Sequence, residues 1–311
     1  MSPVKMFPIK LFRGFSLIEL MISSVLSLLL LAVAIKLYQN HQATYRYQEG
    51  LARMQENARM AMHMLYTGIQ AAGYVGCGRI DNIQTNLASK KLIAPDKIIG
   101  SYKSNEILPD SDAIFIRHMN TQAIQITAKL NRNDTILFIK PDKGLKQDDN
   151  IIIADCTQMQ TTKIIEQTSK QVRITPELQY SFSSQAQIGR LTESRFYLAD
   201  TERINSMGQP IFSLYWMDVS RHKLASEVIE GVEKMKIRYG VLLPSGLLYQ
   251  SADQIKDWSK VRTVQIALLL NSIEPVLQKS ESYLFQGNTH QSTDRILRRE
   301  WTTQITLRAL L

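Results

Sequence analysis

The sequence lacks the residue patterns that most enzymes and metal sites require. Its 311 residues include only two cysteines and five histidines, and none of them stands at the spacing of a zinc site. It has no Gly-x-Ser-x-Gly elbow of a serine hydrolase, no phosphate-binding loop with its lysine, and no HExxH motif. We therefore expect no enzymatic activity, no bound metal and no cofactor.

Acidic residues are scarce relative to basic ones. The 28 acidic residues stand against 37 lysines and arginines, which gives a net charge of +9. Lys5, Lys10 and Arg13 precede any acid, so the chain after residue 14 carries +6 (9 minus 3). The other basic residues form only small clusters, such as those at Lys140, Lys143 and Lys146 and at Arg295, Arg298 and Arg299. Nucleic-acid-binding proteins usually show one contiguous basic stripe with interleaved aromatic residues, so nucleic acid is not an expected partner.

One long apolar run begins at Phe15. From Phe15 to Ile35 the only charged residue is Glu19. A helix of this length, rising about 1.5 Å per residue, can cross the ~30 Å hydrocarbon core of a bilayer, and the preceding basic residues would hold the N-terminus in the cytoplasm. The alternative is a secretory signal peptide cut near Ala32 and Ala34. A carboxylate within such a span is costly unless it is paired, so Glu19 is a candidate functional residue.

The segment Arg13–Leu20, with the sequence RGFSLIEL, resembles the class III signal of type IV prepilins and type II secretion pseudopilins. The resemblance implies that a prepilin peptidase cuts between Gly14 and Phe15, on the cytoplasmic side of the apolar run. It also implies that the new N-terminal amine of Phe15 is methylated. Glu19 would then be the fifth residue of the mature chain, and its implied role is to pair with the N-terminal amine of a neighbouring subunit.

The helix is expected to continue past the apolar run, over residues 15–72. No proline falls in this range, and apolar residues recur there at spacings of three and four. They are Leu51, Met54, Ala58, Ala61, Leu65, Ile69 and Ala72. The first half of the helix is apolar on all sides and the second half has one apolar stripe. This difference predicts a first half among other helices and a second half against a globular domain.

The remainder, residues 73–311, is expected to be an antiparallel α+β body behind the helix. Short apolar or alternating runs are separated by turn residues, and no regular alternation of strands and helices appears. The expected strands cover residues 113–117, 123–127, 135–139, 150–154, 171–175, 194–198, 212–216, 232–241, 263–270 and 303–310.

Several segments of this body are similar to minor pilins of the PilW type. They cover residues 70–77, 147–156 (which end in Asp155-Cys156), 228–240 (which contain Glu230-Gly-Val-Glu233), 261–270 and 298–308. The resemblance implies a single-pass inner-membrane protein with a periplasmic C-terminal domain, which then enters the pilus at the cell surface.

The same resemblance implies a low-abundance subunit that primes pilus assembly near the tip. Its implied partners are other minor pilins (FimU-, PilV- and PilX-like), a PilY-type adhesin and the major pilin, besides the prepilin peptidase. A GspJ-like pseudopilin of type II secretion is the main alternative. A membrane-anchored binding domain and a DNA-uptake pilin are two further alternatives.

The two cysteines, Cys77 and Cys156, are far apart in the sequence. If the body lies outside the cytoplasm, a disulfide between them is expected. Closing so long a loop would stabilise the fold by about 4–5 kcal/mol in the chain-entropy model, before any strain is subtracted.

Overall fold

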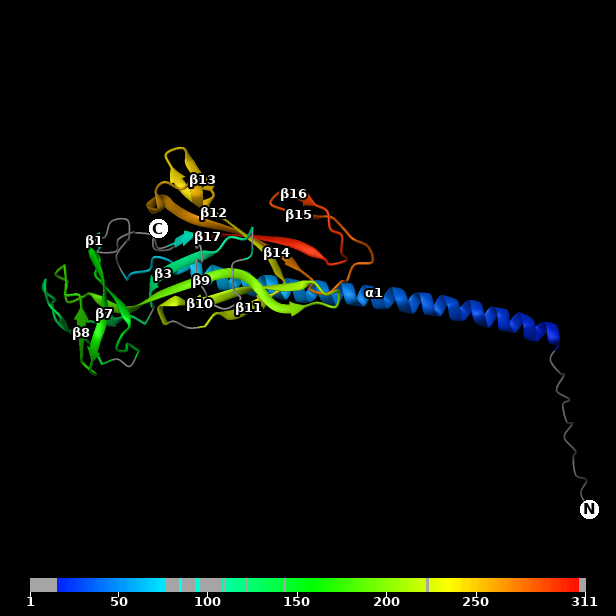
Figure 1. Cartoon of the computed structure of the whole chain (residues 1–311), viewed down its shortest axis with the longest axis horizontal. Helices are drawn as coiled ribbons and strands as arrows, with labels where there is room; N and C mark the ends of the chain where they lie inside the picture. The colour runs from blue at the N-terminus through cyan, green and yellow to red at the C-terminus, as the bar shows by residue number, and fades with distance from the viewer. Residues whose placement is uncertain are drawn as a thin grey trace, which may run out of the picture. The chain divides into compact units, whose positions relative to one another are not determined.

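The computed structural model describes residues 16–76, 84–85, 93–95, 108, 110–120, 122–141, 144–221 and 224–307. The chain divides into two compact units, Met1–Glu49 and Gly50–Leu311. The first unit contributes the first part of a long helix. The second contains the rest of that helix and the β-structure (Figure 1).

The helix α1 runs without a break over Leu17–Gln70, close to the range expected from the sequence. It is long and apolar enough to cross a membrane, with a mean hydropathy of 2.5 over its most apolar 18 residues. Its serines do not leave hydroxyls unpaired in this apolar stretch. Ser23 donates to the carbonyl of Glu19 at 2.7 Å, and Ser27 donates to that of Ser23 at 2.8 Å. Such bonds satisfy hydroxyls that a bilayer cannot.

Within the described residues, the first eleven strands form one sheet with the order β11-β10-β9-β6-β7-β8-β5, and β2, β3 and β4 join it beside this path. All its pairs are antiparallel except the short parallel pair β1–β7. The strands are β1 Gln84–Thr85, β2 Ile93–Pro95, β3 Ile114–Met119, β4 Ile124–Gln125, β5 Ile136–Phe138, β6 Asn150–Ala154, β7 Gln158–Gln167, β8 Gln171–Thr175, β9 Gln187–Ile204, β10 Pro210–Asp218 and β11 Ser226–Glu230.

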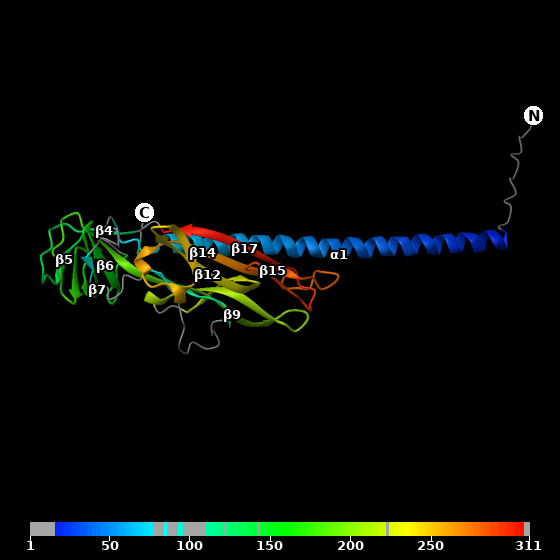
Figure 2. The ribbon, with the colours of Figure 1, turned by 90° about the horizontal axis from the view of Figure 1, so that it is seen from above.

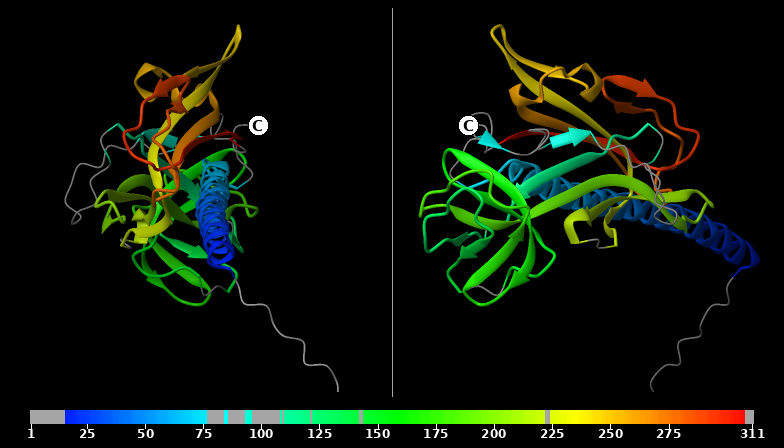
Figure 3. Two further views of the ribbon diagram at one scale, coloured as in Figure 1. Left: turned by 90° about the vertical axis from the view of Figure 1, so that its right-hand side faces the viewer. Right: turned by 60° about the vertical axis from the view of Figure 1, so that its left-hand side comes forward.

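One part of this sheet closes on itself as a small barrel. It is formed by the residues that lie in the sequence between β3 and the second half of β9. The pairs β9–β6, β6–β7, β7–β8 and β8–β5 are continued by a bridge between Ile126 and Ile139, and β4 pairs back to β9. The barrel has its own core, which includes Leu137, Ile153 and Phe182. Its strands lie together at one end of the body (Figures 2 and 3). Closure gives β5 a neighbour on each side, β8 on one side and Ile126 on the other.

The 18-residue strand β9 belongs to both the barrel and the rest of the sheet. Its first residues, Gln187–Arg190, pair with β6. Further along, Leu191–Phe196 pair with β3, and Ser194–Ile204 pair with β10. The barrel is therefore joined to the body through a continuous strand.

The C-terminal part forms a second, four-stranded antiparallel sheet with the order β13-β12-β14-β17. Its strands are β12 Val232–Leu243, β13 Gly246–Gln250, β14 Val261–Asn271 and β17 Arg298–Thr306. A hairpin of β15 Tyr283–Phe285 and β16 Asn288–His290 covers one face, where Phe285 and Tyr283 pack on Ala267 and Leu269. Short 3-10 turns occur at η1 Val219–Arg221, η2 Ala252–Gln254 and η3 Trp258–Lys260.

The second half of α1 packs into the body through its apolar stripe. Every expected stripe residue except Leu51, which is half-buried, is buried, with Leu65 and Ile69 fully inaccessible. Gly68 faces β3 and β9 so closely that a Cβ there would lie 2.8 Å from the ring of Phe196. At the end of the helix, Gly73 donates a backbone bond to Arg117 of β3 at 2.8 Å.

The expected α+β architecture is confirmed: one long apolar helix is followed by an antiparallel β-rich body. The limits of the expected strands match the observed ones only in part. The last strand was expected over residues 303–310; β17 begins at Arg298 and ends at Thr306, and residues 308–310 lie outside the described residues. Its first residues, Arg298 and Arg299, are polar and gave no strand signal, although they continue the pairing with β14.

Candidate functional site

The N-terminal part of the candidate site is the start of α1. Glu19 lies in its first turn, where the exposed backbone N–H groups favour a negative charge. Its neighbours Leu17, Ile18 and Leu20 are apolar and 64–78% exposed. A single chain thus displays one carboxylate within an uncovered apolar surface, which is a stable arrangement only where that surface is covered and the charge is paired. Gly14 and Phe15, the expected cleavage site, lie outside the described residues.

The expected disulfide involves one residue of the described chain. Cys156 follows β6, whereas Cys77 lies outside the described residues, so the bridge stays a prediction. Asp155, beside Cys156, organises the turn into β7. Its carboxylate accepts bonds from the backbone of Thr157 and Gln158 at 2.9 Å and of Ser183 at 3.2 Å. Burial by itself raises the pKa of Asp155, but these hydrogen bonds outweigh it and lower the pKa below its usual value.

A second polar centre, which we call the Arg298 cluster, lies where the two sheets meet. It consists of Arg298, Glu233 and Asp294, whose side chains are only 11%, 16% and 11% exposed. The guanidinium Nε donates to Glu233 Oε2 at 2.8 Å, while Nη1 and Nη2 donate to the two oxygens of Asp294 at 2.7 and 2.8 Å. This fork is the geometry in which arginine binds carboxylates most strongly.

Further contacts hold the Arg298 cluster in place. Asn271 donates to Glu233 at 2.7 Å, and Gln209 donates to Asp294 at 3.3 Å. The guanidinium also lies over the ring of Tyr283, 5.4 Å from its centroid. The cluster therefore ties β12, β14, β15 and β17 to the turn that leads into β10.

The charges of the cluster stabilise each other. Hydrogen bonds from Arg298 hold the pKa of the Asp294 carboxyl well below its usual range, against the opposing effect of burial. Burial alone would lower the pKa of Arg298, but its bonds to Asp294 and Glu233 raise that pKa above its usual value. Both shifts favour the charged forms of Asp294 and Arg298 at neutral pH.

The segment Glu230–Glu233 is the crossing between the two sheets. Gly231 has a φ of +79°, and a Cβ there would lie 3.2 Å from the carbonyl oxygen of Asn271. Both the positive φ and this crowding favour glycine at this point. The crossing also meets the helix, because Asn57 of α1 donates to the carbonyl of Glu230 at 3.2 Å.

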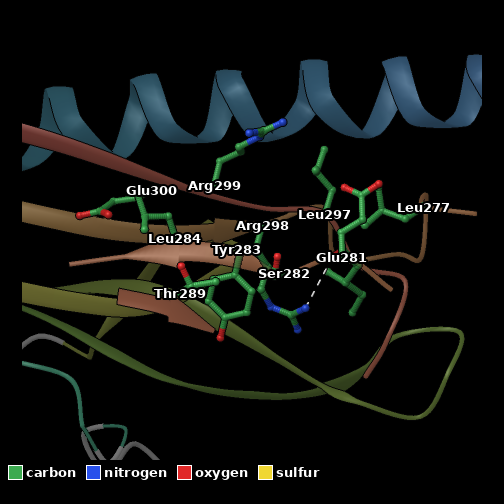
Figure 4. A pocket seen from close by; sticks show the side chains of 11 residues that line it. Leu277, Glu281, Ser282, Tyr283, Leu284, Thr289, Leu297, Arg298, Arg299 and Glu300 are labelled. Carbon is green, nitrogen blue, oxygen red and sulfur yellow. Dashed lines mark hydrogen bonds between the residues drawn. The ribbon is translucent and has the colours of Figure 1, made fainter. Parts of the chain in front are cut away.

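Two cavities flank Arg298. One of about 450 Å³ lies between β17 and the β15–β16 hairpin, with Tyr283, Leu297 and Arg299 in its lining (Figure 4). The other, of about 280 Å³, is lined by Asn205, Phe212 and Glu233 among others. No group of three or more His, Cys, Asp or Glu side chains in the described ranges could hold a metal ion.

The sequence indicated only part of this arrangement. Arg298 was placed with Arg295 and Arg299 in a small basic cluster, yet only Arg298 is turned into the protein. Glu233 was noted within a family-like segment, but its partner is 65 residues away in the chain. No sequence signal connected the two.

Comparison with known families gives two matches, one at each end of the chain. Residues 9–35 match the model described as the prokaryotic N-terminal methylation motif. Residues 213–309 match the model described as type IV pilus-assembly protein W, and this range contains Gly231 and the Arg298 cluster. No curated protein matches the chain.

The methylation motif at the start of a long apolar helix, followed by a globular β-rich domain, fits an inner-membrane-anchored pilin that is then incorporated into the pilus. The match over residues 213–309 narrows this class. Together the two matches support a PilW-like type IV pilin, of the minor kind. They link the chain to prepilin processing and to the pilus machinery, and both families are structural or assembly families, not enzymes.

Proposed function

We propose that this chain primes the assembly of type IV pili and stays near the pilus tip. The observation that carries the proposal is the helix α1. Its first half exposes apolar side chains on every side around one carboxylate, and its second half is built into the body. Such a helix fits a filament core made of many similar helices.

In this proposal, residues 1–14 are a leader that the prepilin peptidase removes, and Phe15 is methylated. Residues 15–35 span the inner membrane before assembly, and residues 73–311 are periplasmic. Glu19 then pairs with the N-terminal amine of a neighbouring subunit. An apolar filament core offers no solvent to a carboxylate, so this pairing removes the cost of leaving Glu19 alone.

The proposed neighbours at the tip are FimU-, PilV- and PilX-like minor pilins, a PilY-type adhesin and the first major pilins. The family match over the C-terminal sheet supports a minor pilin. The size of the body favours a subunit that caps the pilus, not one that repeats along the shaft. A body that contains an additional barrel is harder to repeat along a closely packed shaft.

A type II secretion pseudopilin is the second candidate, since it would share the leader and the helix. The match to a pilus-assembly family favours the pilus. A membrane-anchored binding domain that never leaves the membrane is a third, and it would not explain the exposed carboxylate at Glu19.

The test is deletion of the gene in its own host, followed by complementation. We expect few or no surface pili by electron microscopy, normal protein secretion, and the restored protein in small amounts in sheared pili. Normal piliation with lost secretion would assign the protein to the type II secretion system instead of the pilus. Normal piliation with the protein confined to the membrane would refute a role in any filament.

A further inference from the structure

The hairpin formed by β12 and β13 extends beyond the sheet to which it belongs. β12 pairs with β14 only as far as Val241, where the register shifts, because β14 begins at Val261. Past that point Leu242 pairs with Leu247, and Leu243 pairs with Gly246. Figures 1 and 3 show this hairpin standing out from the body.

The base of the hairpin is firmly anchored. Tyr239 is 1% exposed and meets the ring of Trp258 edge-on, with 4.9 Å between the ring centroids. Thr263 donates to the hydroxyl of Tyr249 at 3.2 Å. At Gly240 a Cβ would lie 2.1 Å from the hydroxyl of Thr263, so a larger residue would force that side chain to move. The projecting part is therefore held in one orientation.

The projecting part is apolar and uncharged. Leu242, Leu247 and Leu248 are 50%, 45% and 48% exposed, and no charged residue occurs from Val241 to Gln250. In the part of the chain that the structure describes, β13 pairs only with β12 and ends its sheet. Natural edge strands are usually protected by a lysine, a proline within the strand or a covering segment. β13 has no such residue within its five positions.

We propose that β13 is a docking edge for an extended, apolar strand of a neighbouring pilin subunit. Unpaired backbone N–H and C=O groups along a strand are recognised by another strand. Leu247 and Leu248 are adjacent and point to opposite faces of β13, so they would select apolar side chains on both faces of the incoming strand. A lipid surface would instead call for basic or tryptophan side chains among the apolar ones, and the projecting part, residues 241–250, contains neither. This inference rests on the proposed role in pilus assembly.

The experiment places a photo-crosslinking amino acid at Leu247 in the full-length chain, expressed in its own host. A matched control places it at Leu224, which is 84% exposed and lies outside any strand. We expect illumination to join the Leu247 form, but not the Leu224 form, to another pilin-type protein. Mass spectrometry should map the crosslink to an uncharged segment with apolar residues on both faces.

A second variant, Leu242→Glu with Leu247→Lys, removes the apolar edge but keeps the hairpin, because opposite charges directly across a pair support it. With the crosslinker moved to Leu248, the yield of crosslinked product from this variant should fall at least about tenfold. The reason is that the partner would have to bury two charges in place of two leucines. The variant Leu224→Lys should keep it.

The outcomes separate the docking edge from the wider function. Absence of the protein from sheared pili would be a failure of the proposed function. Presence in pili, with a Leu247 crosslink only to a second copy of this chain or to no pilin, would overturn the docking edge alone. An unchanged crosslink in the charged double variant would overturn it as well.

Discussion

Replacement of Arg298 by methionine should weaken the fold more than any surface change. The guanidinium binds two carboxylates through three bonds of 2.7–2.8 Å, and all three side chains are at least 84% buried. Arg298→Met keeps much of the side-chain volume but leaves Glu233 and Asp294 as unpaired buried charges. Breaking a buried pair in this way typically costs about 3–5 kcal/mol.

The measurement is the unfolding of the full chain in detergent, followed by tryptophan fluorescence. For a unit of this size each kcal/mol lowers the melting temperature by about 2–4 °C, so we expect a fall of about 10 °C. Arg295→Met is the matched control, because Arg295 is exposed in the same segment. Its effect should stay within about 0.5 kcal/mol.

The loss of stability caused by Arg298→Met should depend on pH. The folded pKa of Asp294 is depressed, so its contribution is present above the unfolded pKa of about 3.9 and is lost as the pH falls through the folded value. In Arg298→Met this depression disappears. The gap between the two proteins should therefore be widest near pH 7 and narrower at pH 3.

A triple variant distinguishes lost charge pairing from lost packing. Arg298→Met combined with Glu233→Gln and Asp294→Asn removes all three charges, and it should recover most of the stability lost in the single variant. The electrostatic account of the cluster would be refuted if Arg298→Met melted at the same temperature as the wild type. It would also be refuted if the loss of stability were the same at pH 3 and pH 7.

The remaining predictions concern the N-terminus, the cysteines and Gly231. Gly14→Val should block leader removal, seen as a slower band on a gel, whereas Glu19→Ala should be cleaved normally but be depleted from sheared pili; the opposite pattern would contradict the two roles. Non-reducing mass spectrometry of periplasmically exposed protein should find Cys77 joined to Cys156, and two free thiols would rule out the bridge. Gly231→Ala should destabilise the fold by about 1–3 kcal/mol and by clearly more than Gly208→Ala, because both glycines have positive φ but only Gly231 lacks space for a Cβ. Equal losses in urea unfolding would mean that crowding by Asn271 is unimportant.

Local patterns made the helix and most strands predictable. The apolar stripe from Leu51 to Ala72 is a signal within one segment, and the observed helix ends within two residues of the expected limits. The strand β7 was missed for an equally local reason. Its inward positions include Gln160 and Thr162, which are buried but polar. They are satisfied by the loop after β8, where Gln160 donates to the carbonyl of Glu177 at 2.8 Å.

The barrel and the Arg298 cluster could not be predicted because both depend on distant pairings. Closure of the barrel requires β4 to find β9 and the Ile126–Ile139 bridge to form, and neither contact leaves a periodic trace. Likewise, the burial of Arg298 is decided by Glu233 on another strand, whereas Arg295 and Arg299 beside it remain at the surface. A basic residue next to two others carries no sign of which one will be buried.

The long strand β9 also determines how the barrel would respond to mechanical force. One backbone runs from the pairing with β6 in the barrel to the pairing with β10 in the body, without a flexible linker. Tension applied to the barrel along β9 acts across the hydrogen bonds to β10, which lie perpendicular to the strands. These bonds share the load and must fail together instead of one after another. The barrel is therefore a stiff attachment, and a force on it acts directly on the sheet that packs against the helix.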